Sequence, residues 1–299
     1  MRFPGVCIHG NIQPDAAVPH REVFAVQLLS VILFALAVSL VQTTRPEGGA
    51  NRVPSVDSIM ARVAANQDRV EKLRSHYDCK EHIRVMTRKQ NGKMMREETA
   101  DYEFVPTSTG PEAQLRSLTG RYWHNGEYDD FKGEPTPDAN SWDADYIHDV
   151  RLCLTEQSRC TDGAHLFPFT TEEQEKYDFH LIGQDSVEGR MAYRIGFAPK
   201  NKEMYLWTGE ALIDNTDFQP IRVFTKFSRR VPFFVRHVMG TNLSGFGYEL
   251  DYKRDQGGDW FPAAYGTEYK LHLFFHINRT ITVSMDTSFV AVGKSTVER

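Results

Sequence analysis

A chain of 299 residues that is 40% hydrophobic and 25% charged has the composition of a globular protein, which excludes a disordered chain. Its 35 basic and 40 acidic residues give a formal net charge of −5 at pH 7, so its charge argues against a nucleic-acid partner. The length accommodates one large domain or two ordinary ones.

The strongest compositional signal lies near the N-terminus, where residues 24–41 read FAVQLLSVILFALAVSLV without a charge. Two interpretations stay open. A signal peptide needs a short apolar region and a small-x-small cleavage site, which Ala35-Leu36-Ala37 supplies, but eighteen apolar residues also just suffice to span a bilayer. We therefore expect an exported protein that is either periplasmic or anchored in the inner membrane through residues 24–41, facing the periplasm.

Three of the four cysteines follow the apolar segment. In an exported chain, Cys153 and Cys160 are close enough in sequence to form a short disulfide loop, which would leave Cys79 as a buried thiol. The sequence contains neither CxxC nor CxxxC, and His148 and His165 do not have a recognised ligand spacing. We expect no metal site.

The first regular element is an amphipathic helix over residues 56–73. Pro54 and Ser55 are typical of a helix start, and apolar residues then recur at helical spacing. This stripe consists of Val56, Ile59, Met60, Val63, Ala64, Val70 and Leu73. A helix with a single apolar stripe needs one apolar surface to lie against.

From His76 onward, apolar and polar residues alternate with the period of two that is typical of half-buried strands. Asn-Gly pairs at residues 91–92 and 125–126 interrupt the alternation, and Asn-Gly between such runs strongly indicates a hairpin. The C-terminal half alternates again. Its run over residues 260–277 is so long that we expect a bend, near Gly266 or just after the run.

The middle of the chain, residues 133–177, has a different pattern. Proline and aspartate punctuate it, and four residues have helical spacing: Trp142, Tyr146, Val150 and Cys153. Thr170 and Glu173 form a capping box, which predicts a short helix through Lys176. We interpret this region as a helical insertion or lid.

Together these patterns predict about nine or ten antiparallel strands, each with one apolar and one polar face, and one helix with one apolar stripe. The fold class is therefore mainly β (α+β): a curved antiparallel half-barrel sheet wrapped around one amphipathic helix, with a small helical insertion. A fixed-period repeat is absent from the sequence, which disfavours a propeller or a solenoid.

The sequence carries no recognisable catalytic motif: HExxH, GxSxG and a P-loop are all absent. His272 and His276 would be neighbours on a helix, but on the expected strand they lie about 13 Å apart and cannot share one ion. We therefore expect a protein that is not an enzyme and needs no cofactor.

Aromatic residues are abundant, and most of them belong to an ordinary core. A curved sheet covered by one helix can also leave an apolar cavity for a lipid tail. The residues expected to line such a cavity are Tyr193, Ile195, Phe197, Ile213, Val223, Phe246, Tyr248, Tyr269, Leu271 and Leu273.

Three stretches carry a resemblance to a known family: VEGRMAYRIGFAPK at residues 187–200, WTGEALIDNTDFQPIRV at 207–223 and DWFPAAYGTEYKL at 259–271. With the export signal, the helix and the hairpins, they resemble the LolA/LolB/RseB-like lipoprotein-localisation fold family. The resemblance implies an open half-barrel of about eleven strands, closed by helices, whose apolar cavity accepts acyl chains in the periplasm. The insertion at 142–160 departs from the compact family core.

Two functions remain open at this point. The first is an exported, non-enzymatic binding protein that holds a lipid or an acylated protein in the half-barrel. The alternative is a membrane-anchored interaction or sensor module that meets a partner through a sheet edge or the aromatic residues of segment 122–131. The expected organisation is a leader (1–23), a signal peptide or anchor (24–44), a linker (45–54), a half-barrel domain (55–290) with a helical insertion (133–177), and a tail (291–299).

Overall fold

The computed structural model describes residues 53–107, 110–133, 142–156, 168–201, 207–228, 242–244, 247–255, 257–273 and 277–291. The leader, the apolar segment at 24–41 and most of the linker lie outside these residues, as do Cys160, Phe246 and His276. None of the helices within the described ranges combines the length and the apolar character needed to cross a membrane.

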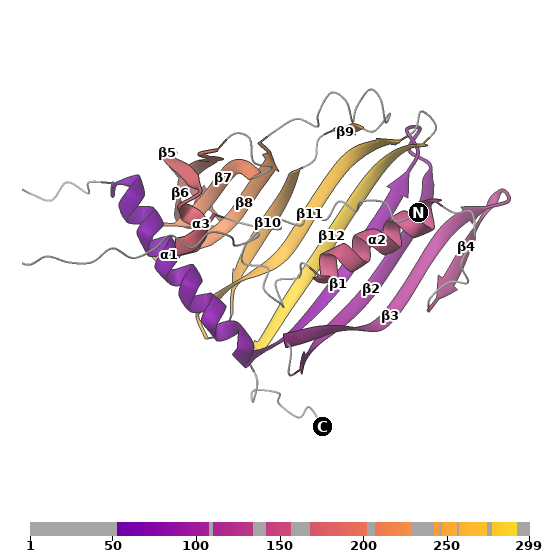
Figure 1. Cartoon of the computed structure of the whole chain (residues 1–299), viewed down its shortest axis with the longest axis horizontal. Coiled ribbons are helices and arrows are strands. Elements are labelled where there is room, and N and C mark those ends of the chain that lie inside the picture. Colours follow the sequence, from indigo (N-terminus) through magenta and orange to yellow (C-terminus); the bar gives the residue numbers. More distant parts are fainter. Residues whose placement is uncertain are drawn as a thin grey trace, which may run out of the picture. The chain divides into compact units, whose positions relative to one another are not determined.

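The sheet is antiparallel throughout and stays open (Figure 1). Its twelve strands are β1 (Tyr77–Arg88), β2 (Met94–Thr107), β3 (Gly110–His124), β4 (Glu127–Lys132), β5 (Tyr177–Val187), β6 (Arg190–Pro199), β7 (Trp207–Asp214), β8 (Pro220–Phe227), β9 (Asn242–Ser244), β10 (Gly247–Arg254), β11 (Trp260–Leu273) and β12 (Ile277–Ala291). Their order is β4-β3-β2-β1-β12-β11-β10-β8-β7-β6-β5, and β9 pairs with β11. The predicted curved half-barrel is confirmed.

Helix α1 (Val56–Leu73) has the bounds that the sequence predicts. Ser55 caps it by accepting a hydrogen bond from the backbone N–H of Ser58 at 3.3 Å. The apolar stripe is buried against the strands β6, β7, β8 and β10. Ile59 and Val63 are fully buried, so this stripe is part of the hydrophobic core.

Both predicted Asn-Gly hairpins are present. Gly92 has φ +83° between β1 and β2, and Asn125 and Gly126 have φ +46° and +102° between β3 and β4. Asparagine and glycine tolerate this left-handed backbone better than other residues. Asn125-Gly126 forms a two-residue turn between His124 and Glu127, whereas Gly92 ends a three-residue loop between Lys89 and Lys93. Glu188-Gly189 makes an analogous turn between β5 and β6, with φ +50° and +79°.

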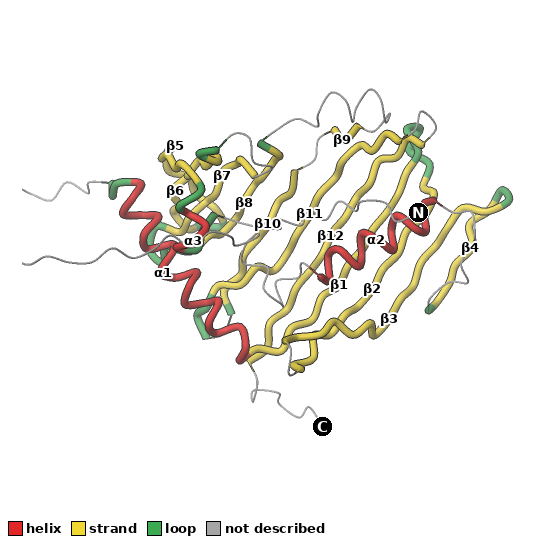
Figure 2. Tube along the Cα trace, in the orientation of Figure 1, coloured by secondary structure: helices red, strands yellow, loops and turns green. Residues whose placement is uncertain are grey.

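Within the described residues 142–156 and 168–177, the insertion forms the helices α2 (Trp142–Glu156) and α3 (Thr171–Gln174). Thr170 is the N-cap of α3, because its hydroxyl accepts a hydrogen bond from the backbone N–H of Glu173. Figure 2 shows that α1 and α2 lie over different parts of the sheet. The sheet is therefore covered by two helices rather than wrapped around α1 alone.

The long C-terminal run is irregular close to Gly266, as predicted, in the β10–β11 ladder between Asp251 and Tyr252. There Asp251 pairs with Ala264 and Tyr252 with Pro262, so β11 carries one extra residue. A bulge of this kind increases the local twist and lets the sheet curve. The strand is shorter than the predicted run, because β11 ends at Leu273 and pairs there with Ile277 of β12.

Candidate functional site

The helix-covered face of the sheet contains two apolar clusters, one under each long helix. The α1 cluster joins Ile59, Met60 and Val63 to inward residues of β6, β7, β8 and β10. The α2 cluster joins Ile147 to inward residues of the neighbouring strands. The sheet part of the α2 cluster consists of Cys79, Ile83, Val85, Ala100, Tyr102, Phe104, Leu118, Tyr269, Leu271, Ile281, Val283 and Met285.

Eight of the ten residues predicted to line a cavity are buried on this face, with exposed fractions of at most 7%. Six belong to the α1 cluster: Tyr193, Ile195, Phe197, Ile213, Val223 and Tyr248. Tyr269 and Leu271 belong to the α2 cluster. Phe246 and the side chain of Leu273 lie outside what the structure describes. The sheet thus brings the eight to one face but divides them between two helices.

Helix α2 covers the sheet with an unexpected stripe. Its most buried side chains are Asp143, Ile147, Arg151 and Thr155, which are spaced by four residues and therefore lie on one side of the helix. The residues at the predicted helical spacing, Trp142, Tyr146 and Val150, flank this stripe and are only partly buried. The fully buried stripe of α2 is therefore largely polar and faces polar partners on the strands, while Trp142, Tyr146, Val150 and Leu154 pack against the apolar cluster on either side of it.

Two polar contacts hold the first half of α2 on the sheet. Asp143 accepts two hydrogen bonds from the Arg279 guanidinium of β12, at 2.8 and 2.9 Å. The Tyr146 and Tyr269 hydroxyls lie 2.7 Å apart. Burial raises the pKa of Tyr146 to about 12, and burial also raises the pKa of Tyr269. Both phenols therefore stay neutral at physiological pH.

A buried group of charges holds the second half of α2. Arg96 Nε donates to Glu98 Oε1 at 2.6 Å, and Arg151 Nε lies 3.0 Å from Glu98 Oε2. Arg151 also donates from Nη1 to the Tyr102 hydroxyl at 3.0 Å. The side chains of Arg96, Glu98 and Arg151 are at most 3% exposed, and Glu81 on β1 is buried as well.

Sequence reasoning missed these charges, although a signal for them exists. Arg96 and Glu98 occupy the same alternate positions of β2 as the buried Ala100, Tyr102 and Phe104. Charged residues on the inward side of a half-buried strand are unusual, because burying an ion without a partner is costly. Their position in the alternation could have identified them as part of a site.

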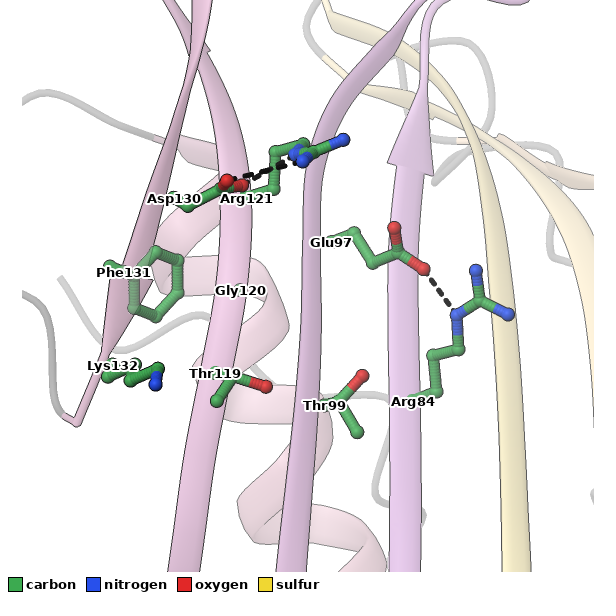
Figure 3. A pocket seen from close by; sticks show the side chains of 9 residues that line it. All are labelled: Arg84, Glu97, Thr99, Thr119, Gly120, Arg121, Asp130, Phe131 and Lys132. Atoms are coloured by element: carbon green, nitrogen blue, oxygen red, sulfur yellow. Dashed lines mark hydrogen bonds and ion pairs between the residues drawn. The ribbon is translucent and has the colours of Figure 1, made fainter.

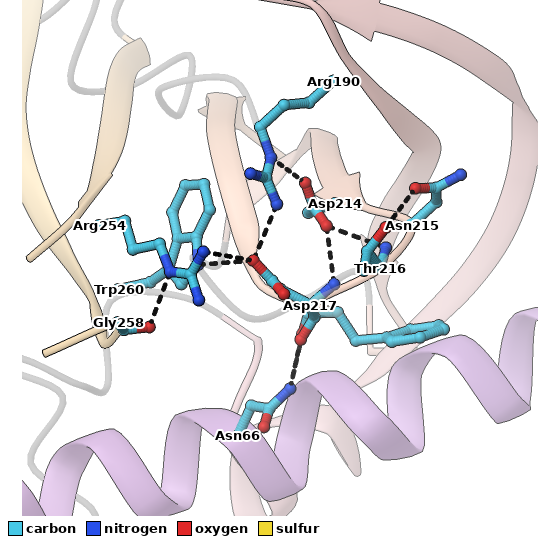
Figure 4. Close-up of polar contacts among 10 residues, drawn as sticks. Asn66, Arg190, Asp214, Asn215, Thr216, Asp217, Arg254, Gly258 and Trp260 are labelled. Carbon is cyan, nitrogen blue, oxygen red and sulfur yellow. Dashed lines mark hydrogen bonds and ion pairs between the residues drawn. The ribbon is translucent and has the colours of Figure 1, made fainter.

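The turn between β7 and β8 fixes the α1-covered half (Figure 4). Arg190 donates to Asp214 at 2.5 Å and to Asp217 at 2.8 Å, and Asn66 of α1 donates to the Asp217 carbonyl at 2.8 Å. Burial opposes ionisation of Asp214, but hydrogen bonds from Arg190 and from the backbone N–H groups of Asp217 and Thr216 outweigh it and lower its pKa. These contacts are structural.

A shallow groove of about 730 Å³ lies on the other face of the sheet (Figure 3). Its lining residues are Arg84, Glu97, Thr99, Thr119, Gly120, Arg121, Asp130, Phe131 and Lys132. Arg84 is paired with Glu97 and Arg121 with Asp130, so these charges are already satisfied. The groove contains none of the residues predicted to line a cavity, and apart from Gly120 and Phe131, whose ring also packs against the α2 cluster, its lining side chains are charged or carry hydroxyl groups.

Both cysteines within the described ranges, Cys79 and Cys153, are disulfide-bonded. The expectation that Cys79 is a free buried thiol is therefore wrong, although Cys79 is buried. Cys160, the expected partner of Cys153, lies outside the described residues. Within the described part of the chain, histidine, cysteine and acidic side chains do not gather into a group that could hold a metal ion.

The chain was compared with known proteins. No family model and no curated protein matches its sequence. Similar solved structures include an outer membrane lipoprotein-sorting protein domain from Vibrio parahaemolyticus, at 12% identity and a TM-score of 0.33, covering 79% of this chain and 95% of that one. A LolA superfamily protein from Nitrosomonas europaea has 9% identity and a TM-score of 0.29, covering 79% and 92%.

A third similar structure is the lipoprotein LppX from Mycobacterium tuberculosis, at 8% identity and a TM-score of 0.26, covering 78% of this chain and 95% of that one. By their names, the lipoprotein-sorting and LolA structures belong to the class that the sequence resembles. TM-scores this low carry no argument about function, which has to come from the site itself.

Proposed function

We propose that this chain is an exported, non-enzymatic binding protein that holds an apolar or acylated ligand, a lipid or a lipoprotein, between α2 and the sheet. The observation that carries the proposal is the contact under α2, where the most buried side chains of the helix include Asp143 and Arg151 although most inward residues of the surrounding strands are apolar. An acyl chain fits that sheet surface better than the helix does, because it buries apolar area without bringing polar groups.

The two helices differ in how costly they are to displace. Helix α1 inserts Ile59, Met60 and Val63 into its cluster, so lifting it would expose a continuous apolar stripe. Helix α2 inserts Asp143 and Arg151 beside Ile147, and water can solvate both charged groups once the helix moves away. The ligand site therefore belongs to the α2-covered half, and the six predicted lining residues under α1 serve mainly as core.

The disulfide-bonded cysteines support export, because such bonds persist in oxidising compartments such as the periplasm. The apolar segment at residues 24–41 supplies the export signal, either as a cleaved signal peptide or as an anchor. Both features fit a protein that handles lipids in the cell envelope.

Mass spectrometry of bound lipid tests this function. The full chain, with its own N-terminus, is expressed in a diderm bacterial host, purified without detergent and extracted with organic solvent. We expect a stoichiometric lipid or acylated species, and we expect none from an unrelated exported protein purified in parallel. A folded chain that is consistently empty would contradict the proposal.

The exposed edge strand β5 favours a second candidate, the anchored interaction module. Leu181 and Ile182 on this edge are 37% and 45% exposed, and an open edge can pair with a strand of another protein. Fractionation separates the two functions: a soluble chain that starts near Val38 favours the carrier, and a full-length membrane-bound chain favours the module.

A further inference from the structure

The buried Arg96 has a hydrogen-bonding donor that the fold does not use. Its Nε is engaged by Glu98, but its Nη2 is buried and has no hydrogen-bond partner. The guanidinium carbon lies 4.8 Å from the centre of the Phe131 ring and 5.4 Å from that of Tyr122. Aromatic rings near a guanidinium group fix its plane and leave its edge for ligands.

Arg151 brings a second guanidinium group to the same carboxylate. It belongs to α2, whereas Arg96 and Glu98 belong to β2, so Glu98 joins the helix to the sheet. The only other arginine that an ion pair holds under α2, within the described ranges, is Arg279, and both oxygens of Asp143 engage it. Arg96 therefore has a buried N–H group, at Nη2, that is available to a ligand on this face of the sheet.

Fold stability alone does not explain this arrangement. A buried ion pair pays a desolvation cost that often cancels its attraction, and well-packed apolar residues of similar volume are as stabilising or more so. Apolar residues occupy several neighbouring inward positions of β1 and β2, namely Ile83, Val85 and Ala100. Arginine is, however, the residue best suited to phosphate and carboxylate groups, because its planar fork donates two parallel hydrogen bonds.

We propose that Arg96, together with Arg151, forms a subsite for the anionic headgroup, phosphate or carboxylate, of the acylated ligand, whose chains lie along the apolar strands beside it. The inference rests on the proposed function and specifies its ligand class as an anionic amphiphile. Glu98 keeps the two guanidinium groups in place, and the anion accepts from the spare Nη2 of Arg96. Closure of α2 brings Arg151 to the bound headgroup.

A competition between lipids tests the subsite. The full chain is incubated with equimolar phosphatidylglycerol, oleate and diacylglycerol, and the lipids that remain bound after gel filtration are counted by mass spectrometry. We expect an excess of an anionic lipid over diacylglycerol of about tenfold or more, because a charge-assisted hydrogen bond corresponds to at least that factor. The ratio of phosphatidylglycerol to oleate tells phosphate from carboxylate.

Three variants assign the effect to Arg96. Arg96→Met keeps the apolar stem and leaves Glu98 paired with Arg151; it should still bind diacylglycerol but lose most of the preference for the anion. Arg96→Lys keeps the charge without the fork, and we expect an intermediate preference. Arg84→Met removes an arginine from the other face of the neighbouring strand and should behave like the unaltered chain.

The outcomes separate the two proposals. If the unaltered chain binds all three lipids equally, or if Arg96→Met and Arg96→Lys keep the full preference, the subsite is overturned while the carrier function stands. If no lipid binds at all, the carrier function fails and the subsite fails with it. If Arg96→Met does not fold, the preference for anionic lipid is compared between Arg96→Lys and Arg84→Met. A weaker preference in Arg96→Lys supports the subsite, and an equal preference overturns it.

Discussion

Glu98 links helix α2 to the sheet, because its carboxylate pairs with one arginine from each. It is 2% exposed and holds two guanidinium groups, one from β2 and one from α2. Removing a carboxylate from a buried ionic group leaves its cationic partners without compensation, which is far more costly than removing an exposed carboxylate.

We therefore expect Glu98→Gln to lower the free energy of unfolding by about 3 kcal/mol. The neighbouring Glu97→Gln is the matched control, because Glu97 pairs with the half-exposed Arg84 on the other face and should cost less than about 1 kcal/mol. Urea denaturation measures both variants. Equal effects would show that the buried ionic group does not behave as described.

Tyr146 predicts a dependence of stability on high pH. Burial raises its pKa to about 12 in the folded chain, against about 10 in the unfolded chain. The folded state therefore holds this proton more tightly, and the stability that it contributes is complete below pH 10 and lost as the pH rises towards 12.

Between pH 9 and pH 12, this single group should lower the free energy of unfolding by about 2 kcal/mol. Tyr146→Phe has no phenolic proton to lose at this position. Its free energy of unfolding should therefore fall by about 2 kcal/mol less than that of the unaltered chain between pH 9 and pH 12. Urea denaturation at several pH values compares the two chains. Parallel pH curves would contradict the burial of this phenol.

At the scale of elements, α1 and α2 differ in what they place against the sheet. Helix α1 has an apolar inner stripe, and sequence periodicity is sufficient to predict its bounds. Helix α2 has Asp143 and Arg151 on its inner side, because charges on the strands are available to pair with them, and its inner Thr155 donates to backbone carbonyls of the helix itself. Helical spacing predicted Trp142, Tyr146 and Val150 as the inner face of α2, but in the structure these residues flank the buried stripe. Sequence periodicity misses this because it does not show ion pairs with distant strands.

Hydrogen exchange should reveal this difference. We expect the amides of α2 to exchange faster than those of α1, because Ile147 is the one apolar side chain of α2 that is fully buried, whereas α1 buries Ile59, Met60 and Val63. Asp143→Ala should accelerate exchange across α2 by about tenfold or more, since it leaves the buried Arg279 without its partner. Asp149→Ala, on the exposed side of the same helix, is the control, and equal exchange in both variants would contradict this role.

At the scale of the whole molecule, the strand-rich half-barrel follows from local signals. The Asn-Gly turns at residues 91–92 and 125–126 and the alternation between them define neighbouring antiparallel strands before any long-range contact is known. The pairing of β1 with β12 is different, because it joins Tyr77 to Ala291 across almost the whole domain. No local pattern encodes that pairing, and it is this pairing that brings Arg279 under α2.

Disulfide mapping tests the processing of the chain. If residues 1–37 are removed, three cysteines remain, and a Cys153–Cys160 bond would leave Cys79 without a partner in the chain. Both Cys79 and Cys153 are disulfide-bonded, and three cysteines can form only one bond within a chain, so a cleaved chain should leave one cysteine as a free thiol or joined to another molecule. Non-reducing peptide mapping of the exported protein measures the pairing; a Cys153–Cys160 peptide together with Cys79 bound to Cys7 would show instead that the N-terminus is retained.

The central claim is that the ligand lies between α2 and the sheet, and photo-crosslinking locates it most directly. The full chain is loaded with phosphatidylglycerol that carries a diazirine in one acyl chain, irradiated, digested and mapped. We expect labels on strand residues under α2, such as Ile83, Val85 and Leu118. Labels confined to the α1 cluster, for example at Ile195, or to the groove beside Thr99 on the opposite face, would contradict it.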